Sequence, residues 1–371
     1  MKEKKIKKSN GGDLFILLIT AILVAFGTVM IFSASYYPSV ENGGDPYFFL
    51  KKQLMWVAVG TVLMFICAKV DYHFWAKFWI IAPIVCLGLL VLVLTPLGSS
   101  AYGATRWIQV GPITIMPGEI SKVGIILFIT GYFSRYPKWG NSLVKGVFPV
   151  VALAGLYGGL IMLQPNMSTA ATVCFIAGGM LLVAGMKIWQ TALVIVAATV
   201  VGTVYIIGDK DGYRYDRFTS FLDPFADPLG NGWQVVQSLL ALGTGGLTGL
   251  GLGNSIQKNL YLPMAQNDFI LAIVGEELGF VGILLLVVVY ILLIWRGFHT
   301  AMNAKDYTGM MLASGIIIML GVQVIINIAV VTSSMPPTGI VLPFISYGGN
   351  ALLIFMAGMG IVYNISKSAD I

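Results

Sequence analysis

The sequence DFILAIVGEELGFVGILLLVVVYILLIW, residues 268–295, is almost continuously apolar. A bilayer core of ~30 Å requires about 20 apolar residues when each adds about 1.5 Å of helical rise. This run therefore predicts a transmembrane helix. It also carries three acids, Asp268, Glu276 and Glu277, which a helix facing lipid would exclude because burying a charge in hydrocarbon is costly.

Composition extends this prediction to the whole chain. Only 10% of the residues are charged and 57% are hydrophobic, whereas soluble domains carry roughly 25% charged residues. Soluble, disordered, collagen-like, disulfide-rich and nucleic-acid-binding proteins are excluded. We predict an all-α polytopic membrane protein with about ten transmembrane helices, in one membrane domain over residues 1–371. The nine further apolar runs lie at about 14–34, 53–69, 75–97, 119–134, 145–163, 168–186, 188–207, 308–331 and 345–365.

The distribution of Lys and Arg predicts the orientation, because cytoplasmic connections are enriched in these residues. When the N-terminus is placed inside, most Lys and Arg fall on inner connections, and many acids fall in one outer loop. Both terminal tails, 1–13 and 366–371, are therefore predicted to be cytoplasmic. The stretch 208–267 is predicted to be a large extracellular loop between helices 7 and 8.

Two parts of this loop have patterns of their own. Residues 233–240 place apolar side chains at helical spacing, as in a helix that lies on the membrane surface. Residues 243–253 are rich in Gly, which is found both in phosphate-binding loops and in turns. Because no GxxxxGK[ST] motif is present, we interpret this run as a turn between helices.

The acids of the run 268–295 leave alternatives open. Asp268 opens the helix, so it is either an N-cap or an unpaired carboxylate whose raised pKa suits a general base. Glu276 and Glu277 lie deeper and must be hydrogen-bonded, paired or protonated. They could hold a distant Lys, or they could form the proton site of a transporter.

Other polar residues interrupt the remaining apolar runs. Glu119 and Lys122 share a helix face and form either a structural ion pair or one wall of a cavity that opens to the outside. Gln323 and Asn327 also share a face, which favours hydrogen bonding between helices. The Pro- and Gly-rich stretch 333–349 must line a cavity or be covered by protein, because broken backbone is not tolerated against lipid.

These residues resemble the SEDS family of bacterial wall synthesis, the FtsW/RodA/SpoVE proteins, over almost the full chain. The stretch 251–258 is most similar to the FtsW/SpoVE type. The order and spacing of the matching motifs carry the resemblance. The motifs are Ile31–Ser35, Arg106-Trp107-Ile108, Pro117-Gly118-Glu119 with Lys122, Gln164-Pro165-Asn166, Asp227–Gly230, Gly251–Ser255, Asn267–Ile270 with Glu276–Gly279, Pro337-Thr338-Gly339 with Leu342-Pro343, and Ser346–Gly349.

The resemblance implies a ten-span glycosyltransferase that polymerises lipid II, with a class B penicillin-binding protein transpeptidase as partner. The catalytic carboxylate of the family corresponds to Asp268, its important tryptophan to Trp107, and its acid–lysine pair to Glu119 and Lys122. Four positions depart from the family pattern: Gly118 and Asn350 replace Ser, Asn166 replaces Asp, and Asn267 replaces Thr. The change at 166 argues against a carboxylate role at that position but not against the reaction.

A mechanism follows as a hypothesis. Asp268 removes the proton from the GlcNAc 4-hydroxyl of the acceptor, and that oxygen attacks MurNAc C1 of the donor. The product is a β-1,4 link, formed with inversion and release of undecaprenyl pyrophosphate. Protein cations, or Mg²⁺ or Mn²⁺, would neutralise the pyrophosphate, and no organic cofactor is expected. The candidate substrate-binding residues are Trp107, Arg106, Glu119, Lys122, Gln164, Arg214, Arg217, Lys258, Glu276, Glu277 and Ser346.

Two other functions are compatible with the sequence. A lipid II flippase or transporter would use Glu276 and Glu277 for coupling, and a scaffold would only recruit the penicillin-binding protein. Transport requires polar groups in the inner half as well, whereas the unusual charges cluster outside. The expected location is the bacterial cell membrane at the division septum, with the active site outside, among divisome or elongasome proteins. The sequence does not choose between division, elongation and sporulation.

Overall fold

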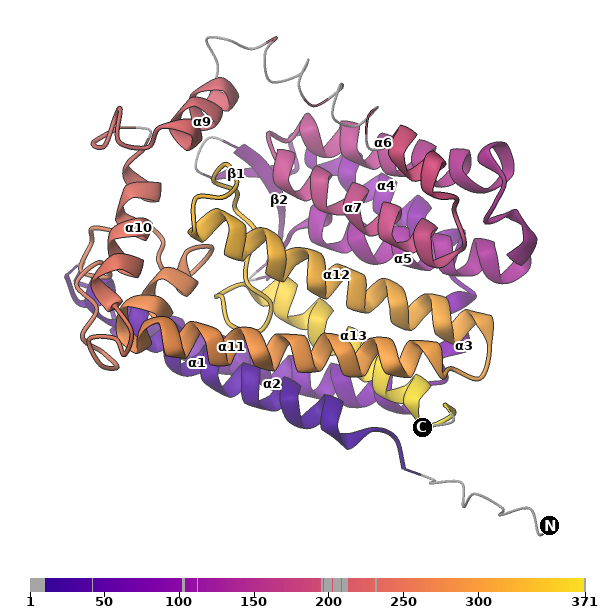
Figure 1. The fold of residues 1–371 in the computed structure, drawn as a ribbon, viewed down its shortest axis with the longest axis horizontal. Helices are drawn as coiled ribbons and strands as arrows, with labels where there is room; N and C mark the ends of the chain where they lie inside the picture. The colour runs from indigo at the N-terminus through magenta and orange to yellow at the C-terminus, as the bar shows by residue number, and fades with distance from the viewer. Residues whose placement is uncertain are drawn as a thin grey trace.

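The protein is a mainly helical bundle whose helices run along its long axis (Figure 1). The computed structural model describes residues 11–41, 43–101, 104–111, 113–194, 196, 202, 208, 213–230 and 232–369. Within these ranges six helices are long and apolar enough to cross a membrane. They comprise α1 (Leu14–Glu41), α2 (Phe48–Lys69), α6 (Phe148–Met162) with the π-turn before it (Leu143–Val147), α11 (Ile270–Met302), α12 (Tyr307–Val331) and α13 (Gly349–Ser366).

The remaining helices are shorter or more polar. Two are short and apolar, α4 (Ile81–Val93) and α7 (Met167–Val183). The others are α3 (Tyr72–Ala76), α5 (Pro117–Arg135), a 3-10 turn (Pro137–Trp139), α9 (Tyr213–Leu222) and α10 (Trp233–Gly245). A multi-pass membrane protein is therefore confirmed, whereas the number of spans remains a prediction.

Most predicted runs coincide with described helices, with two differences. The run 75–97 is divided, because α3 ends at Ala76 and α4 begins at Ile81. The run 188–207 lies mostly outside the described residues, as does most of the tail 1–13. The predicted surface segment 233–240 is helical and forms most of α10.

The prediction that the chain is all-α is wrong at residues 98–115. These residues form an antiparallel sheet in the order β1-β2-β3, with β1 at Gly98–Ala101, β2 at Ala104–Val110 and β3 at Ile113–Ile115. Ile108 pairs with Ile115, and Trp107 pairs with Ser99. β2 and β3 contain Thr, Ile and Val, which favour sheets, but each strand is too short to stand out beside the long apolar runs.

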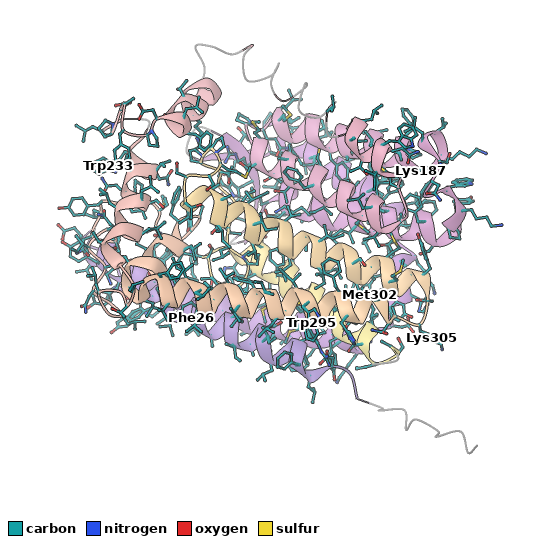
Figure 2. The ribbon with its side chains drawn as sticks, viewed as in Figure 1. Phe26, Lys187, Trp233, Trp295, Met302 and Lys305 are labelled. Atoms are coloured by element: carbon teal, nitrogen blue, oxygen red, sulfur yellow. The ribbon has the colours of Figure 1, made fainter. Side chains whose placement is uncertain are left out.

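The start of the first helix, α1, and the end of the last helix, α13, lie together on one side of the bundle (Figure 1). The backbone N–H of Asp13, just before α1, donates to Ser366 Oγ at the end of α13 at 2.8 Å. Lys187 and Lys305 also lie at this end, whereas Trp233 lies at the opposite end (Figure 2). Both lysines therefore lie far from this part of the large loop, and the side of the membrane on which each end lies stays a prediction.

The core centres on α12, which packs against α5, α7, α11 and α13. Its apolar residues surround the helix on all sides, as expected for a helix enclosed by others. In its most apolar window, 67% of the residues are buried, against 22% in α11. Most of α12 is therefore enclosed by other helices, whereas much of α11 is exposed on the outside of the bundle.

The helix α11 breaks at Gly279, where φ is +67°, and the large loop fills the break. Glu276 O accepts from the N–H of Leu250, and Glu277 O accepts from the N–H of Gly251, each at 2.9 Å. Beyond the break, the N–H of Phe280 donates to Gly246 O at 2.9 Å. Backbone groups freed by the break therefore find partners inside the protein, as the membrane requires.

The side chains of Glu276 and Glu277 bind the next part of the loop, residues 255–258. Glu276 accepts from the N–H of Ile256 at 3.0 Å and from the Ser255 hydroxyl. Glu277 lies 2.8 Å from Lys258 Nζ and accepts from Ser33 Oγ of α1 at 2.6 Å. We call residues 255–258 with Glu276 and Glu277 the acid clip. It holds the loop against both α11 and α1.

A close approach between α1 and the stretch before α13 yields a first prediction. A Cβ added at Gly27 would lie 2.3 Å from Phe344 O and 2.6 Å from Ile345 Cα, and both of these are backbone atoms. Gly27→Ala should therefore lower the free energy of unfolding by about 1–3 kcal/mol, measured by thermal unfolding in detergent. Gly88→Ala in α4, where nothing lies within 4 Å, is the control. Equal midpoints for the two variants would contradict this packing.

The acid clip yields a second prediction. Lys258 and Glu277 are 7% and 0% exposed, so removal of one partner leaves a buried charge and costs about 3–5 kcal/mol. Lys258→Met and Glu277→Gln should each destabilise strongly, and the double variant should recover most of the loss. The exposed pair Lys51–Asp45, with Nζ and Oδ2 2.6 Å apart, is the control, and Lys51→Met should cost about 0–1 kcal/mol. Additive losses in the double variant would show that the buried pair is not coupled.

Candidate functional site

Asp268 lies at the end of the large loop, two residues before α11 begins at Ile270. The chain approaches it through a bent segment in which Leu260 and Met264 both have positive φ. The side chain of Asp268 is half-buried. Burial raises the pKa of its carboxyl group to about 6, while its backbone hydrogen bond and the Arg217 charge act in the opposite direction. Such a group changes its protonation state near neutral pH, as a general base must.

The second element of the site is the turn at residues 337–339. A Cβ built on Gly339 would lie 4.0 Å from Asp268 Oδ2. Arg217 of α9 donates through Nη1 to Pro337 O at 3.0 Å, and its charge lowers the pKa of the Asp268 carboxyl group. The fold thus joins three segments that are distant in sequence: α9, the end of the large loop and the turn after α12.

The stretch from Leu342 to α13 supports the turn. Ser346 Oγ accepts from the N–H of Leu342 at 2.8 Å, and the N–H of Tyr347 donates to Gln266 O at 2.9 Å. Ser346 is 4% exposed, so its hydroxyl holds the backbone in place. The hydrogen bond of Ser346 with Leu342 is internal to the protein. A role of Ser346 in substrate binding stays a prediction.

Arg106 and Gln164 are brought together, at a different part of the same outer region. Arg106 Nε donates to Gln164 O at 3.3 Å, and Nη2 donates to Pro165 O. The Gln164 side chain is buried and donates to Leu90 O at the end of α4 at 3.0 Å. Trp107, the neighbour of Arg106 in β2, is half-buried. The sheet is tied to the start of α13 by Asn350 Nδ2, which donates to Thr114 O at 2.8 Å.

Glu119 and Lys122 form a buried ion pair in the first turns of α5. Lys122 Nζ lies 2.6 Å from Glu119 Oε1, and the two side chains are 1% and 11% exposed. The other carboxylate oxygen, Glu119 Oε2, has no hydrogen-bond partner within the described part of the chain. Of the two alternatives left open by the sequence, this burial favours a structural pair.

Three predicted binding residues take part in the acid clip instead of facing an open site. Glu276, Glu277 and Lys258 are buried, and each bonds within the protein. Of the alternatives for the two acids, the distant Lys partner is observed for Glu277. Arg214 lies in α9, but its side chain is outside the described residues.

Asn327 of α12 is the residue that sequence reasoning misinterpreted. Its amide does not join another helix. It donates through Nδ2 to Asp268 O and to Ile340 O, both at 2.8 Å. The sequence did offer a signal for this contact. Asn327 lies shortly before the Pro- and Gly-rich stretch 333–349, whose irregular backbone carbonyls need hydrogen-bond donors. Gln323, one turn earlier, has no side-chain hydrogen bond among the described residues.

The described residues contain no group of three His, Cys, Asp or Glu side chains placed to hold a metal ion. Three buried oxygens at this place, Asn267 Oδ1, Asn327 Oδ1 and Thr338 Oγ1, have no partner among the same residues. Asp268 thus supplies one carboxylate here, and the three oxygens without partners are neutral. A hard cation could use such a set only together with oxygens of a substrate.

A cavity of about 510 Å³ lies next to the site. It is lined by the end of α1, the α1–α2 connection and the start of α2, and by residues of the segment 260–266 that leads to Asp268. Its lining is mainly apolar and reaches Gln266, two residues before the carboxylate. The geometry thus places an apolar hollow, a carboxylate of raised pKa and a cation at one end of the bundle.

Known proteins are similar to this chain over almost its full length. The chain is 38% identical to "Probable peptidoglycan glycosyltransferase FtsW" of Geobacter sp. (strain M18), covering 97% of this chain and 98% of that protein. It is 39% identical to "Stage V sporulation protein E" of Bacillus subtilis (strain 168), with the same coverage of the two chains.

Solved structures share the fold. One chain, from work on the structural coordination of polymerization and crosslinking by a peptidoglycan synthase complex, aligns with a TM-score of 0.78 at 28% identity, over 96% of this chain and 97% of that one. The rod shape determining protein RodA of Thermus thermophilus aligns with a TM-score of 0.70 at 24% identity, over 97% and 98% of the two chains, and shows the fold alone. The sequence profile of the FtsW/RodA/SpoVE cell cycle proteins matches residues 13–371. The chain therefore belongs to the FtsW/RodA/SpoVE family.

Proposed function

We propose that this protein is a peptidoglycan glycosyltransferase that polymerises lipid II at the outer face of the cell membrane. The observation that carries the proposal is Asp268, a half-buried carboxylate whose pKa burial raises to about 6. The names of its full-length relatives support the same chemistry. The lipid tail of such a substrate lies in the membrane and its sugars lie outside. The base must therefore lie where the large loop meets a membrane helix, as Asp268 does.

In the proposed reaction, the Asp268 carboxylate takes the proton from the GlcNAc 4-hydroxyl of the acceptor. The oxygen forms a bond to MurNAc C1 of the donor while the bond from C1 to the pyrophosphate oxygen breaks. Attack opposite the α-linked pyrophosphate gives a β-1,4 link with inversion. Undecaprenyl pyrophosphate leaves with the bonding electrons, and the proton remains on Asp268 until solvent removes it.

Arg217 is a cation whose charge acts on Asp268. We assign it to the departing pyrophosphate, whose charge grows as the bond breaks. Mg²⁺ or Mn²⁺ would supply further positive charge, held by oxygens of the substrate pyrophosphate. No organic cofactor is needed for this displacement.

We further propose ten transmembrane helices, both termini in the cytoplasm and the loop 208–267 outside. The contact of Asp13 with Ser366 supports placing both ends on one side. We place the protein at the division septum, as an FtsW/SpoVE-type enzyme that works with a class B penicillin-binding protein among divisome proteins. The resemblance of the stretch 251–258 supports the type, and the synthase complex of the structural relative supports a partner.

Transport is the second candidate function. A coupling site should be reachable by protons or solute, but Glu276 and Glu277 are fully buried and bonded within the acid clip. A scaffold for the penicillin-binding protein would not need a carboxylate of raised pKa. Both observations favour the transferase.

Loss of the carboxylate tests the base directly. Asp268→Asn should retain expression and thermal stability but reduce polymer formation from labelled lipid II by at least about 100-fold, the order expected for a general base. Asp223→Asn, which changes an exposed carboxylate of the same loop, should polymerise normally. Normal polymer formation by Asp268→Asn would refute the assignment.

The raised pKa of Asp268 predicts the pH dependence. Because the base must be ionised, kcat/KM should be constant at higher pH and fall below about pH 6, by about tenfold per pH unit. Arg217 lowers this pKa, so Arg217→Gln should move the midpoint to higher pH, and Arg217→Lys should move it less. The profile is measured as initial rates at limiting lipid II. An unchanged midpoint in Arg217→Gln would contradict the assigned charge contact.

A further inference from the structure

We propose that Asn327 is the positioning residue for the catalytic carboxylate: its amide fixes the backbone of Asp268 relative to the turn that forms the opposite wall of the site. The inference rests on the proposed function, because it assigns a role to Asn327 only through Asp268. Asn327 lies on α12, the most enclosed of the long helices, and is 1% exposed.

The geometry joins three elements at one side chain. Asn327 Nδ2 donates to Asp268 O at 2.8 Å and to Ile340 O at 2.8 Å. Asp268 precedes α11, and Ile340 follows the turn 337–339, so neither carbonyl lies within a helix. Gly339, next to Ile340, is the residue whose added Cβ would approach Asp268 Oδ2 to 4.0 Å. The amide of Asn327 thus holds the backbone of Asp268 and the backbone next to Gly339 in a fixed relative position.

The chemistry of the amide group explains why Asn suits this place. Its NH₂ group carries two hydrogens, one for each carbonyl, on a short side chain. The opposite orientation of the amide would set an oxygen against two carbonyl oxygens, so the orientation follows from the partners. Asn327 Oδ1 has no partner within the described ranges, so the donor side alone makes the described contacts.

Other contacts keep the two segments near each other without setting the carboxylate. The N–H of Tyr347 donates to Gln266 O at 2.9 Å, and Arg217 donates to Pro337 O at 3.0 Å. These contacts lie two or more residues from Asp268 and from Ile340. Loss of the Asn327 amide should therefore leave the fold assembled but free the Asp268 peptide and the turn to move apart.

A displaced base should slow the chemical step more than it weakens binding. Asn327→Asp keeps the shape and removes both N–H donors, and Asn327→Ser keeps one donor on a shorter side chain. Each variant should lower kcat for lipid II polymerisation by about 10- to 100-fold, the effect of a displacement near 1 Å. KM should remain within about twofold of the parent value.

Hydrogen–deuterium exchange of the purified protein supplies a readout that does not depend on activity. In Asn327→Ser, exchange should increase in the segments 262–269 and 337–342, which are separated in sequence and each accept a hydrogen bond from this amide. It should not increase in the acid clip segment 255–258. Gln323→Met, which alters the buried amide one turn away on the same helix, is the matched control and should change neither kcat nor exchange.

The outcomes separate this inference from the proposed function. If Asp268→Asn polymerises normally, the assigned base is wrong and the role of Asn327 falls with it. If Asp268→Asn is inactive while Asn327→Ser and Asn327→Asp keep kcat within about twofold of the parent, the proposed function stands and this inference is overturned. Equal effects of Gln323→Met and Asn327→Ser would also overturn it, because both would then report general loss of packing.

Discussion

The constraint on which the structure depends is that backbone groups freed by a break in a membrane helix, and fully buried acids, must find partners inside the protein. The large loop meets this constraint by bonding to the broken helix α11. Its residues 246–251 bind the backbone at the Gly279 break, and residues 255–258 bind the side chains of Glu276 and Glu277. The loop therefore follows a fixed path along α11. Asp268 lies where that path ends.

The charged residues near the large loop and in α5 divide into two kinds. The first kind forms buried ion pairs, one between Lys122 and Glu119 and the other between Lys258 and Glu277. Asp268 differs from them, because its carboxylate is half-buried and lies near a cation without forming a close ion pair in the described structure. Buried pairs stabilise a particular arrangement, whereas a carboxylate of raised pKa can exchange protons. This contrast favours chemistry at the outer face over passage of protons or solute along the acids of α11.

The apolar runs predicted most of the helices, since length and hydropathy suffice for a helix that must cross a bilayer. The sheet at 98–115 was not predicted, because strands of three to seven residues carry little periodic signal. Asp268 was identified from its isolation in an apolar run. The contact of Lys258 with Glu277 could not be predicted, because it depends on the path that the long loop takes along α11. The contact of Asn327 with Asp268 O could not be predicted either, because its acceptor is a backbone atom, which leaves no mark in the sequence.

The central claim is that this chain itself forms the glycosidic bond, and purified protein in detergent tests it most directly. Without a bilayer there is no membrane to cross, so fluorescent lipid II can only be polymerised or left unchanged. The account predicts glycan strands and release of undecaprenyl pyrophosphate by the wild-type chain with Mg²⁺ or Mn²⁺ present. Unchanged lipid II, both alone and with a class B penicillin-binding protein added, would contradict it.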